Sequence, residues 1–92
     1  MQSLAHALPG ALAELLRGAP LSPGKVAFAW NAAVGPAVQR ASAVHLEGSV
    51  LLVDASTAAW AHEISRSSAV ILTRLQTLLG AGVVARIEIR RA

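Results

Sequence analysis

The sequence predicts an α+β fold with two layers, a three-stranded sheet and helices on one of its faces, in the order helix, helix, strand, strand, helix, strand. Apolar residues recur at helical spacing near the N-terminus and between positions 60 and 79. Alternating or β-branched runs instead occupy positions 43–55 and 83–91. Because 92 residues suffice for one core, we expect a single domain over residues 1–92, with the second face of the sheet left open.

Two helices are predicted before the sheet. The first is marked by leucines at positions 4, 8, 12, 15 and 16, and Pro9 should kink it or mark its start. For the second, Ser22 can accept a backbone N–H as the N-cap, and Pro23 suits the first helical position. We therefore expect the second helix to span residues 23–34.

The second helix should place Trp30 in the core and leave Phe28 on the opposite side. Gly35, which precedes a proline, should end this helix, with one further turn as far as Arg40. We therefore assign structural roles to Trp30 and Gly35.

A β-hairpin is predicted over residues 43–55. Gly48 opens a two-residue turn of the glycine-first type, which gives this glycine a structural role. If alternate residues from Leu51 onward face the helices, Val50 and Leu52 must face outward. That apolar pair would form a surface for a partner or a second copy, unless side chains of the neighbouring strands cover it.

A long helix should follow the hairpin, capped by Ser56 or Thr57 and ended by the glycines after residue 79. Trp60 and Ile64 begin its apolar stripe, which continues to Leu78. We expect Trp60 to be buried between this helix and the sheet, so that Trp60 and Ile64 have structural roles.

The last strand should cover residues 83–91. Its alternation places four apolar residues toward the core: Val83, Ala85, Ile87 and Ile89. Arg86, Glu88 and Arg90 then face outward, and Arg91 follows at the end of the strand.

Asp54, Ser56, Thr57 and His62 stand close together in the sequence, as catalytic groups often do at a strand-to-helix junction. His62 lies opposite the apolar stripe, however, and neither hydroxyl lies in a Gly-x-Ser-x-Gly elbow. The sequence also contains no His-Glu-x-x-His pair, no cysteine, and no phosphate-binding loop around its single Gly-Lys dipeptide. We therefore predict a protein that is not an enzyme and that has no metal, no cofactor and no small-molecule substrate. We expect the strand-to-helix junction to have a structural role.

Eight Lys/Arg against five Asp/Glu give a net charge of +3, and a small basic domain is suited to neutralise nucleic-acid phosphates. The candidate contacts are Arg86, Arg90, Arg91, Arg66, Arg40 and Lys25. The alternatives are a charged edge strand that discourages aggregation and, on the long helix, an ion pair between Arg66 and Glu63. Because aromatic residues are few, we expect contacts to phosphates with little sequence selectivity rather than base stacking.

No apolar run reaches the roughly 18 residues of a membrane-spanning helix, and no basic stretch precedes an apolar segment as in a signal peptide. Together with the absence of cysteine, this predicts a cytoplasmic protein without membrane contact.

Four motifs, taken in order, resemble one family. They are WNAAVG at the end of the second helix, HLEGSVLLV across the hairpin, STAAWAHEI at the start of the long helix, and the ending LLGAGVVARIEIRR. Over about residues 12–90, the chain is similar to the DciA family of bacterial proteins that load or recruit the replicative helicase. That family was long catalogued as a domain of unknown function.

The resemblance implies a domain similar to the KH fold, without the Gly-x-x-Gly loop with which KH domains clamp a nucleic-acid backbone. It also implies a role in the initiation of DNA replication, by binding the DnaB-type helicase and DNA, single-stranded or without sequence preference, and without ATP hydrolysis. From the residues, two other functions stay open: a protein-interaction module whose basic charge is incidental, and a general nucleic-acid-binding KH-like domain.

Overall fold

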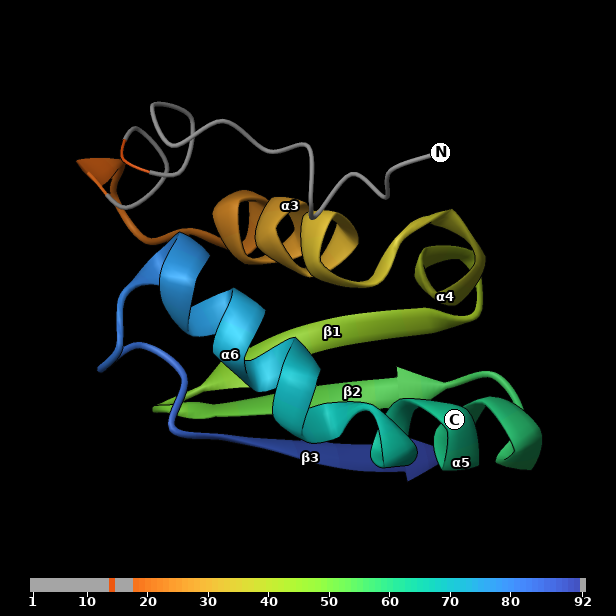
Figure 1. The fold of residues 1–92 in the computed structure, drawn as a ribbon. Coiled ribbons are helices and arrows are strands. Elements are labelled where there is room, and N and C mark those ends of the chain that lie inside the picture. The colour runs from red at the N-terminus through yellow and green to blue at the C-terminus, as the bar shows by residue number, and fades with distance from the viewer. Residues whose placement is uncertain (1–13, 15–17, 92) are drawn as a thin grey trace.

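The computed structural model describes residue 14 and residues 18–91, and it shows a three-stranded sheet with helices layered on one face (Figure 1). The predicted first helix with its leucine stripe lies outside the described residues. From residue 23 onward the elements are α3 (Pro23–Val34), α4 (Pro36–Arg40), β1 (Ser42–Glu47), β2 (Val50–Ala55), α5 (Ala58–Arg66), α6 (Ser68–Leu79) and β3 (Arg86–Arg91). The predicted α+β class is confirmed.

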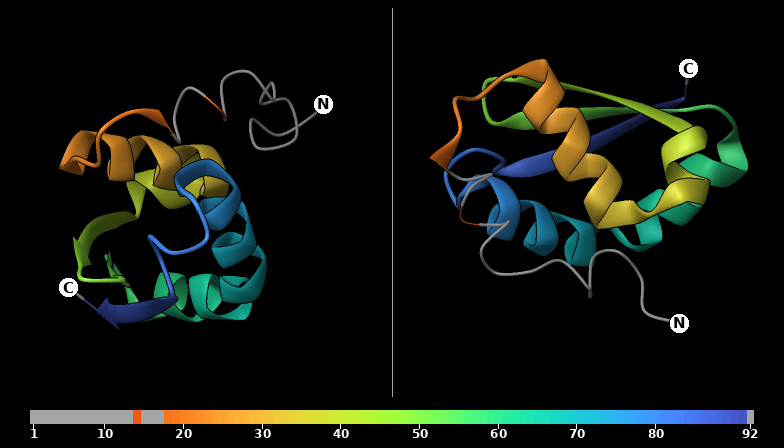
Figure 2. Two further views of the ribbon diagram at one scale, coloured as in Figure 1. Left: turned by 90° about the vertical axis from the view of Figure 1, so that its left-hand side faces the viewer. Right: turned by 90° about the horizontal axis from the view of Figure 1, so that it is seen from above.

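The sheet has the order β1-β2-β3, so β2 is the central strand. β1 and β2 pair antiparallel through the predicted hairpin. β2 and β3 pair parallel, because α5 and α6 carry the chain back over the helical face before β3 begins (Figure 2). This register fixes which residues share each face of the sheet.

The hydrophobic core lies between the sheet and the helices. α3 packs against both β1 and α6, and α5 packs against β2 and β3. The largest fully buried side chains come from both layers: Trp30, Leu51, Val53, Ile64, Leu75 and Val84. The predicted burial of Trp30 and Ile64 is therefore confirmed.

Trp30 connects three elements through its polar atom. The indole Nε1 donates to the Ser42 hydroxyl at 3.0 Å, and that hydroxyl donates to the Val38 carbonyl at 2.6 Å. A buried tryptophan usually requires such a partner for its N–H. The chain of hydrogen bonds thus ties α3 to the start of β1 and to α4.

The predicted boundaries of α3 and of the hairpin are confirmed. The Ser22 hydroxyl accepts the Lys25 N–H at 3.1 Å, and α3 ends at Gly35, whose φ of +85° and ψ of 173° only glycine adopts readily. Gly48 has the positive φ, +59°, that a glycine-first type II′ turn requires. No described non-glycine residue has a positive φ.

The prediction of a single long helix after the hairpin is wrong, because the helix is interrupted at Ser67 and divides into α5 and α6. The Ser67 N–H donates to the Ile64 carbonyl at 3.1 Å, so the turn tightens there. Three serines fall between positions 65 and 68, and serine competes with helical hydrogen bonding. The break lets α5 lie against β2 and β3 while α6 packs against α3.

Two expectations about burial are corrected. Trp60 packs against the core but is only partly buried, so its expected burial is incomplete, and Trp30 is the tryptophan that the core encloses. The last strand begins at Arg86 rather than at residue 83, after a turn that shifts the predicted alternation. As a result Val84 is fully buried and Ala85 is exposed.

Candidate nucleic-acid interface

The outer face of the sheet, opposite the helices, carries residues in three rows set by the strand register. The rows are Glu47–Val50–Arg86, His45–Leu52–Glu88 and Ala43–Asp54–Arg90. Leu52, at the centre, is only 7% exposed, and Val50 is partly buried. The exposed apolar pair expected as a partner surface therefore does not form. The face presents charged side chains instead.

The charged side chains of this outer face are paired. Arg90 donates to both carboxylate oxygens of Asp54, from Nε at 3.0 Å and from Nη2 at 3.2 Å. Arg86 Nη1 lies 3.5 Å from Glu88, and His45 Nε2 lies 3.4 Å from Glu47. With three carboxylates against two arginines, this face is not the basic surface that the predicted positions of Arg86 and Arg90 suggest.

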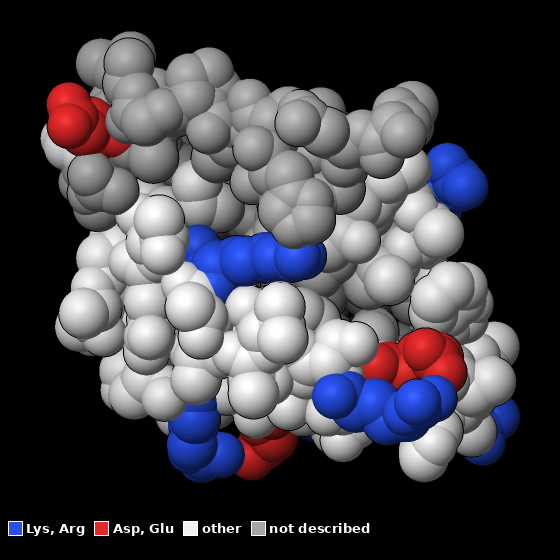
Figure 3. Space-filling model, viewed as in Figure 1, with Lys and Arg blue, Asp and Glu red and all other residues white. Residues whose placement is uncertain are grey.

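The other described cations lie away from the outer face: Lys25, Arg40, Arg66, Arg74 and Arg91. Only two carboxylates accompany them among the described residues, Glu14 and Glu63. Figure 3, which views the helical side, shows the cations as separate groups rather than as one patch, and some of these groups lie against acidic atoms. The position of each cation therefore decides what it can bind.

Lys25 and Arg66 are held by local contacts. Lys25 is 9% exposed, and its Nζ donates to the Ala19 carbonyl at 2.6 Å, so the ammonium secures the chain before α3. Arg66 Nη1 lies 3.1 Å from Glu63, which is the ion pair expected from the sequence. Neither side chain is as available to a phosphate as the sequence alone suggests.

Three arginines gather at one end of the sheet, where α4 leads into β1, β2 leads into α5, and β3 ends (Figure 1). Arg40 ends α4 two residues before β1 begins, and the strand register places Arg90 beside Asp54 and Arg91 beside Ala55. We call Arg40, Arg90 and Arg91 the basic end. It holds three guanidinium groups against the single carboxylate of Asp54.

An open hollow of about 220 Å³ lies at the basic end. It is lined by Arg40, Ala41, Ser42, Ala43, Asp54 and Ser56. Within the described part of the chain, Arg40 and Arg91 have no carboxylate within ion-pair distance. Both side chains are exposed, so they can reach an anion at the surface.

A second hollow, of about 150 Å³, lies between α3 and α4 on one side and α5 and α6 on the other. Its lining consists of Trp60, Glu63, Ser67 and Arg74 together with aliphatic side chains. Arg74 Nη1 donates to the Ala33 carbonyl at 2.9 Å, near the end of α3. Arg74 was not among the predicted candidate contacts, because a contact across 41 residues leaves no local pattern.

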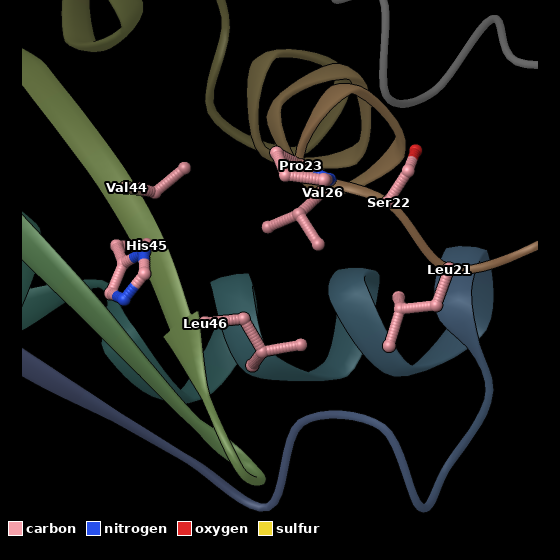
Figure 4. Close-up of a pocket in the computed structure, with 7 residues that line it drawn as sticks. All are labelled: Leu21, Ser22, Pro23, Val26, Val44, His45 and Leu46. Atoms are coloured by element: carbon pink, nitrogen blue, oxygen red, sulfur yellow. The ribbon is translucent and has the colours of Figure 1, made fainter.

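An apolar hollow of about 230 Å³ opens where α3 begins beside the edge strand β1 (Figure 4). Val26, Val44 and Leu46 contribute to its walls, and His45 is its one titratable lining residue. The one hydroxyl of the lining, that of Ser22, accepts the Lys25 N–H as the N-cap of α3, and the His45 Nε2 lies 3.4 Å from Glu47. Each polar group of the hollow thus has a local partner or a structural role.

The strand-to-helix junction has the structural geometry expected for it. The Thr57 hydroxyl accepts the Trp60 N–H at 3.1 Å and caps α5, while the carboxylate of Asp54 is taken by Arg90. His62 is exposed on α5. Among residues 18–91, no group of three or more His, Cys, Asp or Glu side chains is arranged to hold a metal ion. No described helix is long and apolar enough to cross a membrane.

Comparison with known families matches residues 3–89 to the family described as Dna[CI] antecedent, DciA. Neither the curated proteins nor the solved structures contain a match to this chain. The matched residues span α3 to α6 and most of β3, which are the elements that build the sheet, the helical layer and the core. This family has a role in loading the DnaB-type helicase for replication. The chain belongs to the DciA family.

Proposed function

We propose that this protein is a non-enzymatic adaptor in the initiation of DNA replication, which binds the DnaB-type replicative helicase and DNA without hydrolysing ATP. Membership of the DciA family supports the helicase partner. The observation that supports the DNA contact is the basic end, where Arg40, Arg90 and Arg91 gather.

The basic end suits phosphate contact better than the other cations do. Arg40 and Arg91 are exposed and free of carboxylate partners among residues 18–91, whereas Arg66 and Arg86 each share a carboxylate, as Arg90 does with Asp54. Guanidinium groups can bind a phosphate with two parallel N–H donors. Contacts of this kind carry no base information, so we expect DNA binding without sequence preference.

The position of Lys25 supports a function without ATP hydrolysis. A phosphate-binding loop needs a lysine that reaches the phosphates from a glycine-rich turn before a helix. Here Gly24 and Lys25 lie inside the first turn of α3, and the Lys25 ammonium is turned back onto the Ala19 carbonyl. The lysine of the one Gly-Lys dipeptide in the sequence thus binds the segment that precedes α3.

The DNA contact is tested by fluorescence anisotropy with labelled single-stranded DNA over a series of salt concentrations. If Arg40, Arg90 and Arg91 each neutralise a phosphate, replacing all three by alanine should reduce the salt slope by about 2. Arg86→Ala is the matched control, because Arg86 lies on the same strand at the opposite end, beside Glu88. An unchanged slope in the triple variant would exclude the basic end as the DNA site.

The helicase contact is tested by pull-down of the cognate replicative helicase with the wild-type protein and with the triple variant. Retention of the helicase by both proteins, with DNA binding weakened only in the variant, is the expected result. If the wild-type protein retains helicase but shows no DNA binding at low salt, it is an interaction module whose basic charge is incidental.

A further inference from the structure

We propose that the hollow between α4 and the α5–α6 junction receives one unstacked base of single-stranded DNA, with Trp60 as the stacking surface and Arg74 as the cation beside it. This inference rests on the proposed DNA binding and adds base contact to it. It reverses the expectation of phosphate contacts alone, because that expectation counted Trp60 among the core residues.

The two tryptophans of the chain differ in the state of their indole groups. Trp30 is 1% exposed and its Nε1 donates to Ser42. Trp60 is partly exposed on the wall of the hollow, and within the described residues its Nε1 donates no hydrogen bond. An aromatic ring that is left partly open, with its N–H unpaired, is suited to bind a further ring from outside.

The polar groups around Trp60 favour a nucleotide over an apolar side chain. Arg74 uses one N–H on Ala33, and a guanidinium offers five donors, so further donors can bind a phosphate or a base edge. Ser67 adds a hydroxyl at the helix break. Glu63 also lines the hollow, but Arg66 lies 3.1 Å from it and offsets its charge.

The size and place of the hollow limit what it holds. Its volume of about 150 Å³ is well below the roughly 300–1,000 Å³ of typical small-molecule sites, so it accommodates a ring rather than a whole ligand. The short helix α4 connects it to the basic end, because Val38 lines this hollow and Arg40 lines the other. A strand held by phosphates at the basic end can therefore place a base at Trp60.

The test uses tryptophan fluorescence and anisotropy with two oligonucleotides of equal length, oligo-dT and an abasic strand that has the same phosphates without bases. Oligo-dT should quench the fluorescence of the wild-type protein, and the abasic strand should not, although both should bind at low salt. Because Trp30 is fully buried, the quenching reports on Trp60. Absence of quenching by bound oligo-dT would overturn the inference and leave the proposed DNA binding intact.

Substitutions provide the second readout. Trp60→Leu should weaken oligo-dT binding about 5-fold or more, from the usual contribution of one stacked base, and should change binding of the abasic strand less than about 2-fold. Trp60→Phe keeps a ring and should retain most of the affinity. Phe28→Leu, which changes the 49% exposed ring on α3, is the matched control and should have no effect.

Four outcomes would contradict this assignment. Equal loss of both oligonucleotides in Trp60→Leu, or a loss of oligo-dT binding in Phe28→Leu, would show that no base rests on Trp60. Loss of helicase capture by Trp60→Leu, with DNA binding unchanged, would make the hollow a protein contact. If the wild-type protein binds neither oligonucleotide at low salt, the proposed DNA binding itself fails.

Discussion

Replacing Trp30 by alanine should remove a large part of the stability of the domain. The side chain is 1% exposed, and deleting a buried tryptophan to alanine typically costs about 3–5 kcal/mol. A chain of 92 residues is expected to have a free energy of unfolding of about 5–14 kcal/mol. Trp60→Ala should cost about half as much, because Trp60 is only partly buried.

Urea unfolding followed by far-ultraviolet circular dichroism measures both effects. With a slope of about 1 kcal/mol per molar urea, Trp30→Ala should lower the midpoint by about 3 M or more. Trp30→Phe serves as a milder variant if the alanine variant does not fold. If Trp60→Ala proves more destabilising than Trp30→Ala, our assignment of the core tryptophan is wrong.

The hydrogen bonds of Trp30 can be tested separately with Ser42→Ala. This change removes the acceptor of the Trp30 Nε1 and one of the donors to the Val38 carbonyl. The indole N–H is left without a protein partner, whereas the Val38 carbonyl keeps the Ala41 N–H at 3.1 Å. Unpaired buried groups cost about 1–3 kcal/mol, so the midpoint should fall without a change in slope. A variant as stable as the wild type would mean that water replaces the serine hydroxyl at no cost.

Three further predictions concern the helix end, the basic end and catalysis. Gly35→Ala should lower the free energy of unfolding by about 1–3 kcal/mol, since φ +85° with ψ 173° is strained for alanine. In the same urea melts the control Gly24→Ala, inside α3, should change the free energy of unfolding by less than about 0.5 kcal/mol. Asp54→Asn should tighten binding of single-stranded DNA at low salt, because it removes the one carboxylate of the basic end. It should alter the free energy of unfolding by less than about 1 kcal/mol. Weaker DNA binding of this variant in anisotropy would count against the basic end. Purified protein should not hydrolyse ATP in a phosphate-release assay, and an activity that disappears in Lys25→Met would show that Lys25 does contact phosphates.

Local patterns were sufficient to predict several elements. The Ser22-Pro23 pair defined the start of α3, and Gly48 defined the hairpin turn, because capping and positive φ depend on residues adjacent in the chain. The inward positions of Leu51 and Val53 followed from strand alternation and are confirmed by their complete burial. The break at Ser67 was missed, because the apolar stripe continues across it.

The candidate site was predicted less well, because charge pairing depends on the sheet register. Arg90 and Asp54 are 36 residues apart in the sequence, yet the parallel pairing of β2 and β3 joins them directly. Arg86 is paired with Glu88 on the same strand, which the alternating pattern permits but does not require. The grouping of Arg40 with Arg91 likewise requires α4 and β3 to end at the same side of the sheet.

The sequence by itself determined the α+β class, the boundaries of α3 and the hairpin, and the motifs by which the chain resembles its family. These properties arise from periodicity, capping and turn residues, which act over a few positions. The tertiary structure alone decided which tryptophan is enclosed, which arginines keep free donors, and which hollows open at the surface. Those outcomes depend on how distant elements pack, and Trp60 is left partly open on the wall of the hollow that α3 and α4 form with α5 and α6.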